Sequence, residues 1–330
     1  NKSISITGTN GKSTTAKILH EVLKDQKYDV RLIGNIGNPV LSEKKITKKT
    51  IFVIEASSYQ LDYSKIFTTK YAVILNISPD HIERHKNLKN YINAKFKLLE
   101  SQSNKSTAFV KKNDQLIIRT INKSNYKQKI IKVDTLKNEK LLEKINNKYF
   151  LSLGNKENLS FIIKISKKLK LNNKYLLTTL NKFKGLKYRQ QIFYENKNLT
   201  IINDSKSTSF ASSENFLKSL DNVYWILGGV PKKSDQFKLS KINCKNFKAF
   251  IFGNNYKKFE KNLKNKMFVK KIKKLEDVLN EIFLDIQKQK LQKNTIFFSP
   301  AGASFDSFKN FEDRGKYFNQ LAKKFLNAKR

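Results

Sequence analysis

The chain has 330 residues, a length that suits two domains better than one, because a single hydrophobic core stops growing near this size. Its 67 Lys and Arg outnumber its 27 Asp and Glu, giving a formal net charge of +40, yet the lysines are scattered beside asparagines instead of forming one stripe, so we expect no nucleic-acid partner. The single Cys244 excludes an internal disulfide framework, and no run approaches the roughly 20 apolar residues of a membrane span, which favours the cytoplasm.

Short β-rich runs alternate with helical patterns, which predicts parallel sheets crossed by helices. The strands expected in the first half are Ser3–Thr7, Arg31–Ile33, Ile51–Glu55 and Ala72–Asn76. Three shorter runs that could form a flanking sheet are Ala108–Lys111, Ile130–Val133 and Lys148–Ser152. The strands expected in the second half are Thr200–Asn203, Val223–Leu227, Ala249–Phe252 and Thr295–Ser299. Between the last two, Leu275–Gln287 has the apolar spacing of an amphipathic helix.

This pattern predicts an α/β fold with two domains. Residues 1–184 are expected to form a P-loop-type domain with a mainly parallel sheet, and residues 185–330 a Rossmann-like domain. No long Gly/Ser linker separates them, so we expect a short hinge near Gly185.

A glycine-rich loop follows the first expected strand and precedes a helix expected at Thr14. Its residues are Gly8, Thr9, Asn10, Gly11, Lys12 and Ser13. Glycines let backbone N–H groups fold onto phosphate oxygens, while Lys12 adds positive charge and the Ser13 hydroxyl can hold Mg²⁺. Only two residues separate the glycines, where the general motif has four. The alternative is a chance loop of the same composition, but the strand-loop-helix context favours phosphate binding.

Polar residues also follow two later strands. Glu55 closes an apolar strand, where a carboxylate beside a phosphate loop is well placed to bind Mg²⁺. The alternative is a solvated acid that caps the next helix. His81 follows Asp80 after the next strand, although a lone histidine is more often structural. Lys95 lies in a helix expected over Tyr91–Glu100, and its local sequence does not distinguish it from the other lysines.

Together these segments resemble the Mur ligases, ATP-dependent enzymes that form amide bonds in peptidoglycan precursor synthesis, over essentially the full length. The loop from Gly8 to Thr14, Glu55 and Asp80-His81 are shared by the whole superfamily, including folylpolyglutamate synthetases. The resemblance implies that this loop binds ATP and that Lys12 is catalytic. It also implies two Mg²⁺ ions, arranged by Ser13, Glu55, His81 and a carbamylated Lys95, a modification that needs a neutral amine first.

The end of the chain is most similar to the branch of this family that adds D-glutamate to UDP-N-acetylmuramoyl-L-alanine. The segments that carry this similarity are Asn203–Thr208, Leu227–Lys232 and Ser299–Phe318. The residues that the resemblance places around D-glutamate are Thr208, Lys232, Ser304, Phe305 and Phe311. A dicarboxylate needs a cation, hydroxyls and N–H donors, and aromatic walls exclude water. For the two phenylalanines the alternative is plain core packing.

The resemblance also implies contacts with the nucleotide and with the muramoyl substrate. Asn155 and Asn158 match an adenine-recognising pair, although in so asparagine-rich a chain the pair can be a coincidence. Arg189 matches an arginine at the γ-phosphate, and Asp204 an aspartate on the ribose or phosphate side. Lys206 matches a lysine that reaches toward the phosphates, and Asn35 a residue that contacts the muramoyl substrate.

The implied reaction phosphorylates the terminal alanine carboxylate with ATP, and the amine of D-glutamate then attacks the acyl phosphate. Lys12, Lys206 and Arg189 would neutralise phosphoryl charge. Two alternatives remain: another ligase of the superfamily, such as folylpolyglutamate synthetase, or, from a different class, a basic ATPase that binds nucleic acid. Because the implied residues lie on either side of Lys184, we expect the domains to close on each other during the reaction.

The chain begins with Asn1 instead of methionine, and the first strand follows at once, which suggests a fragment. The family has an additional N-terminal domain that binds the uridine diphosphate end of the substrate, and this sequence has no counterpart of it. We therefore expect ATP binding to survive and affinity for the nucleotide-sugar substrate to drop. We also expect a monomer.

Overall fold

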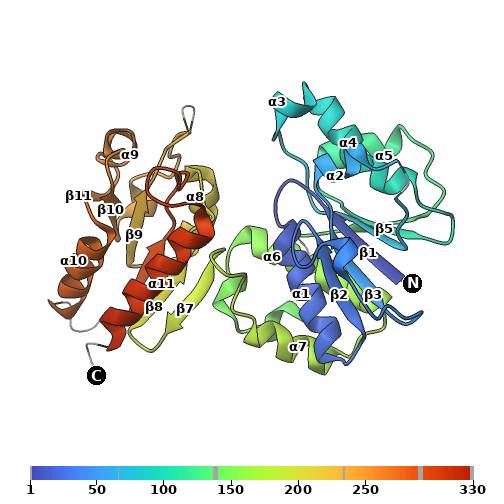
Figure 1. The fold of residues 1–330 in the computed structure, drawn as a ribbon, viewed down its shortest axis with the longest axis horizontal. Helices are drawn as coiled ribbons and strands as arrows, with labels where there is room; N and C mark the ends of the chain where they lie inside the picture. Colours follow the sequence, from blue (N-terminus) through green and yellow to red (C-terminus); the bar gives the residue numbers. More distant parts are fainter. Residues whose placement is uncertain (1, 66, 137–139, 233–234, 289–292, 328–330) are drawn as a thin grey trace. The chain divides into compact units, whose positions relative to one another are not determined.

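The computed structural model describes residues 2–65, 67–136, 140–232, 235–288 and 293–327. Asn1, on which we based the expectation of a fragment, lies outside the described residues. The chain divides into two compact units, Asn1–Phe183 and Lys184–Arg330, so the division falls one residue before the predicted one. Figure 1 shows that each unit is a sheet with helices on both faces, which confirms the predicted α/β fold.

The sheet of the first unit has six parallel strands in the order β2-β3-β1-β4-β5-β6. These strands are β1 (Lys2–Thr7), β2 (Val30–Gly34), β3 (Ile51–Glu55), β4 (Tyr71–Ile74), β5 (Thr107–Lys111) and β6 (Lys129–Val133). The expectation of a separate flanking sheet is wrong, because β5 pairs with β4 and so extends the same sheet.

The predicted strand over Lys148–Ser152 is also wrong. Lys148–Phe150 is a 3-10 turn, in which the Asn147 side chain accepts a hydrogen bond from the Tyr149 N–H, and Ser152 caps the next helix. Tyr149 and Phe150 are both buried, and each packs its ring edge-on or stacked against Phe183.

The helices of the first unit form two layers. They are α1 (Lys12–Asp25), α2 (Ser58–Tyr63), α3 (Ile82–His85), α4 (Leu88–Glu100), α5 (Gln115–Asn122), α6 (Leu153–Lys168) and α7 (Asn173–Lys182). Helix α1 packs against α6 and α7, whereas α2, α4 and α5 cover the other face, where Leu61, Ile74 and Phe96 share a core (Figure 1). Helix α4 begins before the predicted Tyr91 because the Asn87 side chain caps its first turn.

The second unit has a mixed sheet in the order β11-β10-β9-β12-β8-β7, in which only β7 is antiparallel to its neighbour. The strands are β7 (Gln191–Glu195), β8 (Leu199–Asn203), β9 (Val223–Gly228), β10 (Phe247–Phe252), β11 (Phe268–Ile272) and β12 (Asn294–Phe298). The sequence did not predict β7 and β11. Both are edge strands with partly exposed side chains, so neither has the continuous apolar run of a buried parallel strand.

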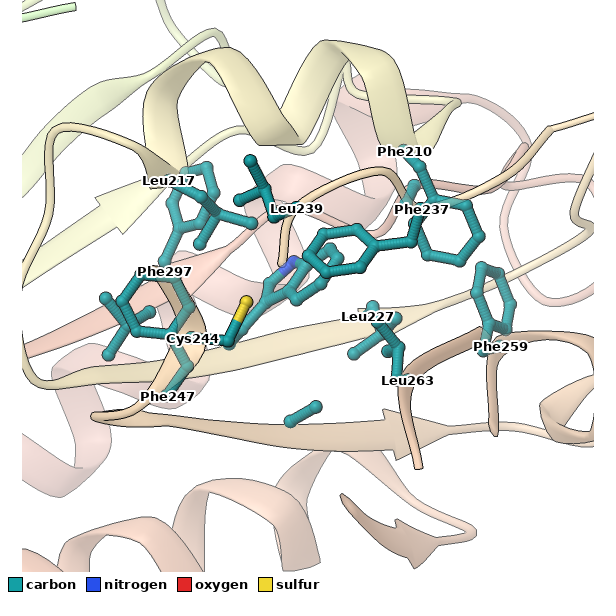
Figure 2. Close-up of a cluster of buried hydrophobic side chains, with 14 of the residues drawn as sticks. Phe210, Leu217, Leu227, Phe237, Leu239, Cys244, Phe247, Phe259, Leu263 and Phe297 are labelled. Carbon is teal, nitrogen blue, oxygen red and sulfur yellow. The ribbon is translucent and has the colours of Figure 1, made fainter. Parts of the chain in front are cut away.

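Among the described residues, the helices that cover this second sheet are α8 (Phe210–Leu217), α9 (Tyr256–Leu263), α10 (Leu275–Lys288) and α11 (Phe311–Asn327). Helix α10 confirms the amphipathic helix predicted over Leu275–Gln287. Phe210 and Phe259 bury against Leu227 on one face of the sheet (Figure 2). On the other face the ring of Phe318 stacks on that of Phe298, with 4.2 Å between their centroids. Further 3-10 turns are Val40–Ser42, Leu142–Lys144 and Ile242–Cys244.

Candidate functional site

Three polar segments meet at one edge of the first sheet, because β1 lies between β3 and β4 and all three strands run in parallel. The glycine-rich loop follows β1, Glu55 ends β3, and the segment Asn76–His81 follows β4. The carboxyl ends of parallel strands are where open α/β sheets bind ligands.

The glycine-rich loop is held by Asn76, a residue that the sequence reading did not single out. The Asn10 N–H donates to Asn76 Oδ1 at 2.8 Å, and Asn76 Nδ2 donates to the Asn10 carbonyl at 3.1 Å. Gly11 is the N-cap of α1 and has a left-handed φ of 84°. A Cβ on Gly11 would lie 2.2 Å from Asn158 Oδ1, so glycine is required there.

The positive charge of the loop comes from Lys12 at the start of α1. Its Nζ donates to the Gly8 and Thr9 carbonyls, at 2.9 Å each. The next residue, Ser13, is buried, and the Thr14 hydroxyl lies 3.4 Å from the Tyr149 hydroxyl. A cation beside the amino end of a helix suits a polyphosphate.

Lys95 reaches the same loop from α4. Its Nζ donates to the Gly8 carbonyl at 2.9 Å and lies 4.5 Å from the centroid of the Tyr91 ring. Burial, together with the charge of Lys12, lowers the pKa of Lys95 to about 7, and Asp80 opposes this shift. Near neutral pH a large share of Lys95 is therefore the neutral amine, which is the form that reacts with CO₂.

The carboxyl of Glu55 is buried at the end of β3. Its Oε1 accepts a hydrogen bond from Asn35 Nδ2 at 3.1 Å, whereas its buried Oε2 has no hydrogen-bond partner among the residues that the structure describes. The alternative that Glu55 caps the next helix is wrong, because Ser57 and Gln60 form the capping box of α2. An unpaired buried carboxylate oxygen is costly unless a cation lies beside it.

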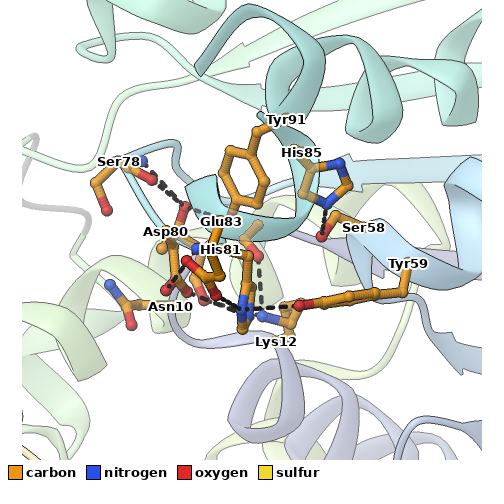
Figure 3. Close-up of polar contacts among 12 residues, drawn as sticks. Asn10, Lys12, Ser58, Tyr59, Ser78, Asp80, His81, Glu83, His85 and Tyr91 are labelled. Carbon is orange, nitrogen blue, oxygen red and sulfur yellow. Dashed lines mark hydrogen bonds and ion pairs between the residues drawn. The ribbon is translucent and has the colours of Figure 1, made fainter. Parts of the chain in front are cut away.

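His81 lies at the start of α3 with a left-handed φ of 52°. Its side chain is 44% exposed, with Nδ1 3.2 Å from the Tyr59 hydroxyl and Nε2 3.5 Å from Asp80 Oδ2 (Figure 3). Glu83 is a further carboxylate, with Oε1 3.8 Å from Nδ1. The imidazole is therefore accessible and surrounded by oxygen atoms.

Two neighbouring residues were not predicted. His85 is buried, with Nε2 3.0 Å from the Ser58 hydroxyl, and burial lowers its pKa. Tyr91 places its hydroxyl 3.0 Å from the Thr9 hydroxyl, and burial raises its pKa to about 12 (Figure 3). Nothing in the local sequence marks either residue, because their contacts depend on how α3 and α4 pack.

The donor set fits Mg²⁺ with phosphate ligands better than a closed metal cage. Within the described ranges, no three His, Cys, Asp or Glu side chains converge on one position. Mg²⁺ usually takes one or two carboxylates and completes its shell with phosphate oxygens and water. The unpaired Oε2 of Glu55 matches the carboxylate part of that requirement. The Lys95 amine on the same sheet edge is not itself an oxygen ligand and would become one only on carbamylation.

The predicted adenine pair lies on α6 beside the phosphate loop. Asn155 Nδ2 donates to the Tyr149 carbonyl at 2.7 Å, and Asn158 packs against Gly11. Both side chains are buried, with 5% of each residue exposed.

In the second unit β12 lies between β8 and β9, so the segments that follow these strands meet at one edge. Val230 and Ala303 exchange two backbone hydrogen bonds of 2.8 Å, which join the segments after β9 and β12. Among the predicted acceptor residues, Ser304 is buried, Thr208 is half-buried and Lys232 is exposed.

Lys206 and Phe311 come together as a cation–π pair, with Lys206 Nζ 4.2 Å from the ring centroid. Phe311 is partly buried, whereas Phe305 is 78% exposed. The alternative that Phe305 packs into the core is therefore wrong.

Arg314 is a fully buried cation that was not predicted from the sequence. Its Nε donates to the Ser205 hydroxyl at 3.2 Å and its Nη2 to the Ser205 carbonyl at 2.8 Å. Burial lowers the pKa of Arg314 to about 10, although Asp306 and Asp204 oppose the shift. Arg314 thereby fixes the segment that carries Lys206 to α11.

Asp204 is buried where β8 ends. Its Oδ1 accepts from the Gln190 N–H at 3.1 Å and its Oδ2 from the Ser299 hydroxyl at 3.0 Å. Burial raises the pKa of Asp204 to about 7, and these hydrogen bonds and the charges of Arg189 and Arg314 only partly offset it. Arg189 and Asp204, both predicted on the nucleotide side, thus lie close enough to interact.

Comparisons with known proteins give consistent matches. Residues 6–173 match the family model described as the Mur ligase middle domain. The UDP-N-acetylmuramoylalanine--D-glutamate ligase of Rickettsia felis is 33% identical over 339 residues, covering 97% of this chain and 75% of that protein. The enzyme of the same name from Petrotoga mobilis is 32% identical over 333 residues, with the same coverage.

Solved structures share the fold. The MurF ligase of Thermotoga maritima in complex with ADP superposes with a TM-score of 0.67 at 14% identity, covering 100% of this chain and 81% of that one. MurF from Acinetobacter baumannii gives a TM-score of 0.65 at 14% identity, covering 98% and 76%. In the part of the chain that the structure describes, no helix is long and apolar enough to cross a membrane.

Proposed function

This chain belongs to the Mur ligase family, and from that premise we propose that it joins D-glutamate to UDP-N-acetylmuramoyl-L-alanine in an ATP-dependent reaction. The observation that carries the proposal is the similarity to relatives of that name over 97% of the chain, at 33% identity. The convergence of the phosphate loop, Glu55 and Lys95 at one sheet edge supports the ATP-dependent part. Because the reaction consumes ATP, we place it in the cytoplasm.

ATP is needed because a carboxylate is a poor electrophile and hydroxide a poor leaving group. Transfer of the γ-phosphoryl group to the alanine carboxylate creates an acyl phosphate. The amine of D-glutamate then forms the C–N bond as phosphate leaves. In this proposal the loop N–H groups and Lys12 bind the triphosphate, while Arg189 and Lys206 balance the charge on the transferred phosphoryl group. Asp204 lies on the ribose or phosphate side, and Asn155 and Asn158 contact the adenine.

Mg²⁺, when bound, would supply charge stabilisation on the phosphoryl oxygens. Ser13, Glu55, His81 and carbamylated Lys95 would hold two ions. Carbamylation joins the neutral Nζ of Lys95 to the carbon of CO₂ with loss of one proton to solvent. It replaces a cation by an anionic oxygen ligand, and the lowered pKa of Lys95 supports this modification.

The acceptor contacts that we propose lie in the second unit. Lys232 and Thr208 would bind carboxylate groups of D-glutamate, and the buried Ser304 would add a hydroxyl. Phe305 and Phe311 would shield the reacting atoms from water. Asn35, which already donates to Glu55, would contact the muramoyl substrate.

We further propose that the reaction requires closure about a hinge near Gly185, because the proposed nucleotide residues lie in both units and the proposed acceptor residues lie in the second. Gly185 has a φ of 84°, a conformation that glycine adopts readily. Small-angle scattering should show compaction when an ATP analogue and the acceptor are added together. An unchanged radius of gyration would contradict the hinge.

The proposed function is tested by phosphate release in the presence of UDP-N-acetylmuramoyl-L-alanine, ATP and one amino acid at a time. D-glutamate should support release, whereas L-glutamate should not. Release that prefers L-glutamate would indicate a different ligase of the superfamily, and release stimulated by nucleic acid without an amino acid would indicate a basic ATPase. Lys12→Met should abolish release, while Lys17→Met, which removes a surface pair with Glu21 on the same helix, should not.

A further inference from the structure

A continuous chain of hydrogen-bonded hydroxyls runs from the buried Asp204 carboxyl to the surface of α8. Ser299 Oγ donates to Asp204 Oδ2 at 3.0 Å and lies 2.7 Å from Ser213 Oγ. Ser213 Oγ lies 2.8 Å from Ser207 Oγ, which in turn lies 2.7 Å from Ser212 Oγ. Every link is within hydrogen-bond distance, so the chain has no gap.

The inner links are shielded from water and the outer link is exposed. Ser299 and Ser213 have no exposed surface, Ser207 is 3% exposed, and Ser212 is an exposed residue in the first turn of α8. Asp204 itself is only 5% exposed, so its direct contact with solvent is small. The hydroxyl chain does offer a route.

Hydroxyl groups suit such a route because each can donate one hydrogen bond and accept two. When Asp204 is ionised, each hydroxyl can donate toward the carboxylate. When Asp204 is protonated, it can donate to Ser299 and every hydroxyl can turn outward. The Ser209 carbonyl can accept at the outer end, since it lies 2.7 Å from Ser212 Oγ and 3.3 Å from Ser207 Oγ.

The surroundings make both charge states of Asp204 accessible near neutral pH. Burial disfavours the carboxylate, whereas Arg189, from the segment before β7, and Arg314, from α11, favour it. Ser299 and the Gln190 N–H donate to its two oxygens. The nearest lysine in sequence, Lys206, has its ammonium over the Phe311 ring. These opposing effects leave the pKa of Asp204 at about 7.

We propose that the hydroxyls of Ser299, Ser213 and Ser207 form a proton path through which Asp204 exchanges its proton with solvent as nucleotide binds and leaves. The proposal rests on the proposed function, in which Asp204 lies beside the nucleotide. The negative charge of a triphosphate favours a neutral neighbour, so binding draws one proton toward Asp204. A hydronium ion at Ser212, replenished by the buffer acid, gives a proton and leaves water. Each hydroxyl passes its own proton inward as it receives another, and the carboxylate gains one.

The proton balance is tested by titration calorimetry with a non-hydrolysable ATP analogue at pH 7, in two buffers of different ionisation enthalpy. A group whose pKa is about 7 is half ionised there, so Asp204 should take up about half a proton on binding. The Asp204→Asn variant should take up about half a proton less than the wild type. Equal uptake by the two proteins would overturn the proposal.

The path itself is tested by stopped-flow with a pH indicator. Ser213→Ala interrupts the chain but leaves the Ser299–Asp204 hydrogen bond in place. Proton uptake would then wait for local opening and should slow by about tenfold or more. Ser213→Thr keeps a hydroxyl and should restore the rate. Ser219→Ala, which removes a hydroxyl that donates to the Phe216 carbonyl outside the chain, is the matched control.

Wild-type uptake rates in Ser213→Ala would overturn the proton path. If that variant does not fold, Ser207→Ala interrupts the chain one link further out and gives the same test. Both measurements need only nucleotide binding. The two proposals can fail separately. If proton uptake depends on Ser213 as predicted but the wild-type protein releases no phosphate with D-glutamate, the proposed function is contradicted and the proton path is still supported.

Discussion

Replacing Gly11 by alanine should damage the phosphate loop more than any other single methyl group added to it. Gly11 has a φ of 84°, which costs an L-residue about 1–2 kcal/mol. The new Cβ would also lie 2.2 Å from Asn158 Oδ1 and 2.9 Å from its Cγ. Asn158 is 5% exposed and cannot swing into solvent, so relief of this overlap should cost about 1–3 kcal/mol.

Together these two effects should cost Gly11→Ala about 2–5 kcal/mol. We expect the loss to appear in the free energy of unfolding of the first unit and in the free energy of nucleotide binding. Gly154→Ala is the matched control, because the position is helical and no atom beyond the adjoining residues and the backbone of its own helix lies within 4 Å of the added Cβ. That control should be neutral or stabilise by up to about 1 kcal/mol. The double variant Gly11→Ala/Asn158→Ala removes the overlap but keeps the backbone strain, so it should recover about half of the lost stability. Its nucleotide affinity should stay low, because the variant also lacks the proposed adenine contact of Asn158.

Urea unfolding followed by circular dichroism, with calorimetric titration of an ATP analogue, measures both effects. Trp225, the only tryptophan of the chain, is buried in the second unit, so its fluorescence gives an internal control that Gly11→Ala should leave unchanged. Equal stability and equal nucleotide affinity in Gly11→Ala and Gly154→Ala would show that neither the φ of Gly11 nor its contact with Asn158 matters.

Three further predictions concern buried charges. Removal of CO₂ from the buffer should lower phosphate release, and added bicarbonate should restore it. Lys95→Met should respond to neither change, and unchanged wild-type activity without CO₂ would count against the carbamate. Because the pKa of Asp204 is raised, the protein should lose up to about 4 kcal/mol of unfolding free energy as the pH rises from about 4 to about 7. Asp204→Asn should flatten this dependence of stability on pH, measured by the fluorescence of Trp225. Arg314→Lys cannot keep both bonds to Ser205 and should destabilise the second unit by about 2–4 kcal/mol, whereas the exposed Arg119→Lys should change stability by less than about 0.5 kcal/mol.

The positions of the loop after β1, of Glu55 and of His81 could be predicted, because parallel strands bring their carboxyl ends to one edge and each segment follows an apolar run. The edge strands β7 and β11 could not, since partial exposure removes the apolar run on which the prediction depends. Resemblance alone indicated Lys95, whose lowered pKa arises from burial on α4, far along the chain from Gly8.

The buried polar contacts of the second unit were the least predictable part. Arg314 reaches Ser205 across 109 positions, and Ser213 reaches Ser299 across 86. No local pattern of charge or hydrophobicity records such distant pairs. They depend on the strand order that places β12 between β8 and β9.

The most direct measurement of the central claim is phosphate release by the wild-type protein with ATP, UDP-N-acetylmuramoyl-L-alanine and either enantiomer of glutamate. D-glutamate should support release with one amide product formed per phosphate, and L-glutamate should support none. Release that is indifferent to the enantiomer, or that needs no amino acid, would contradict the claim.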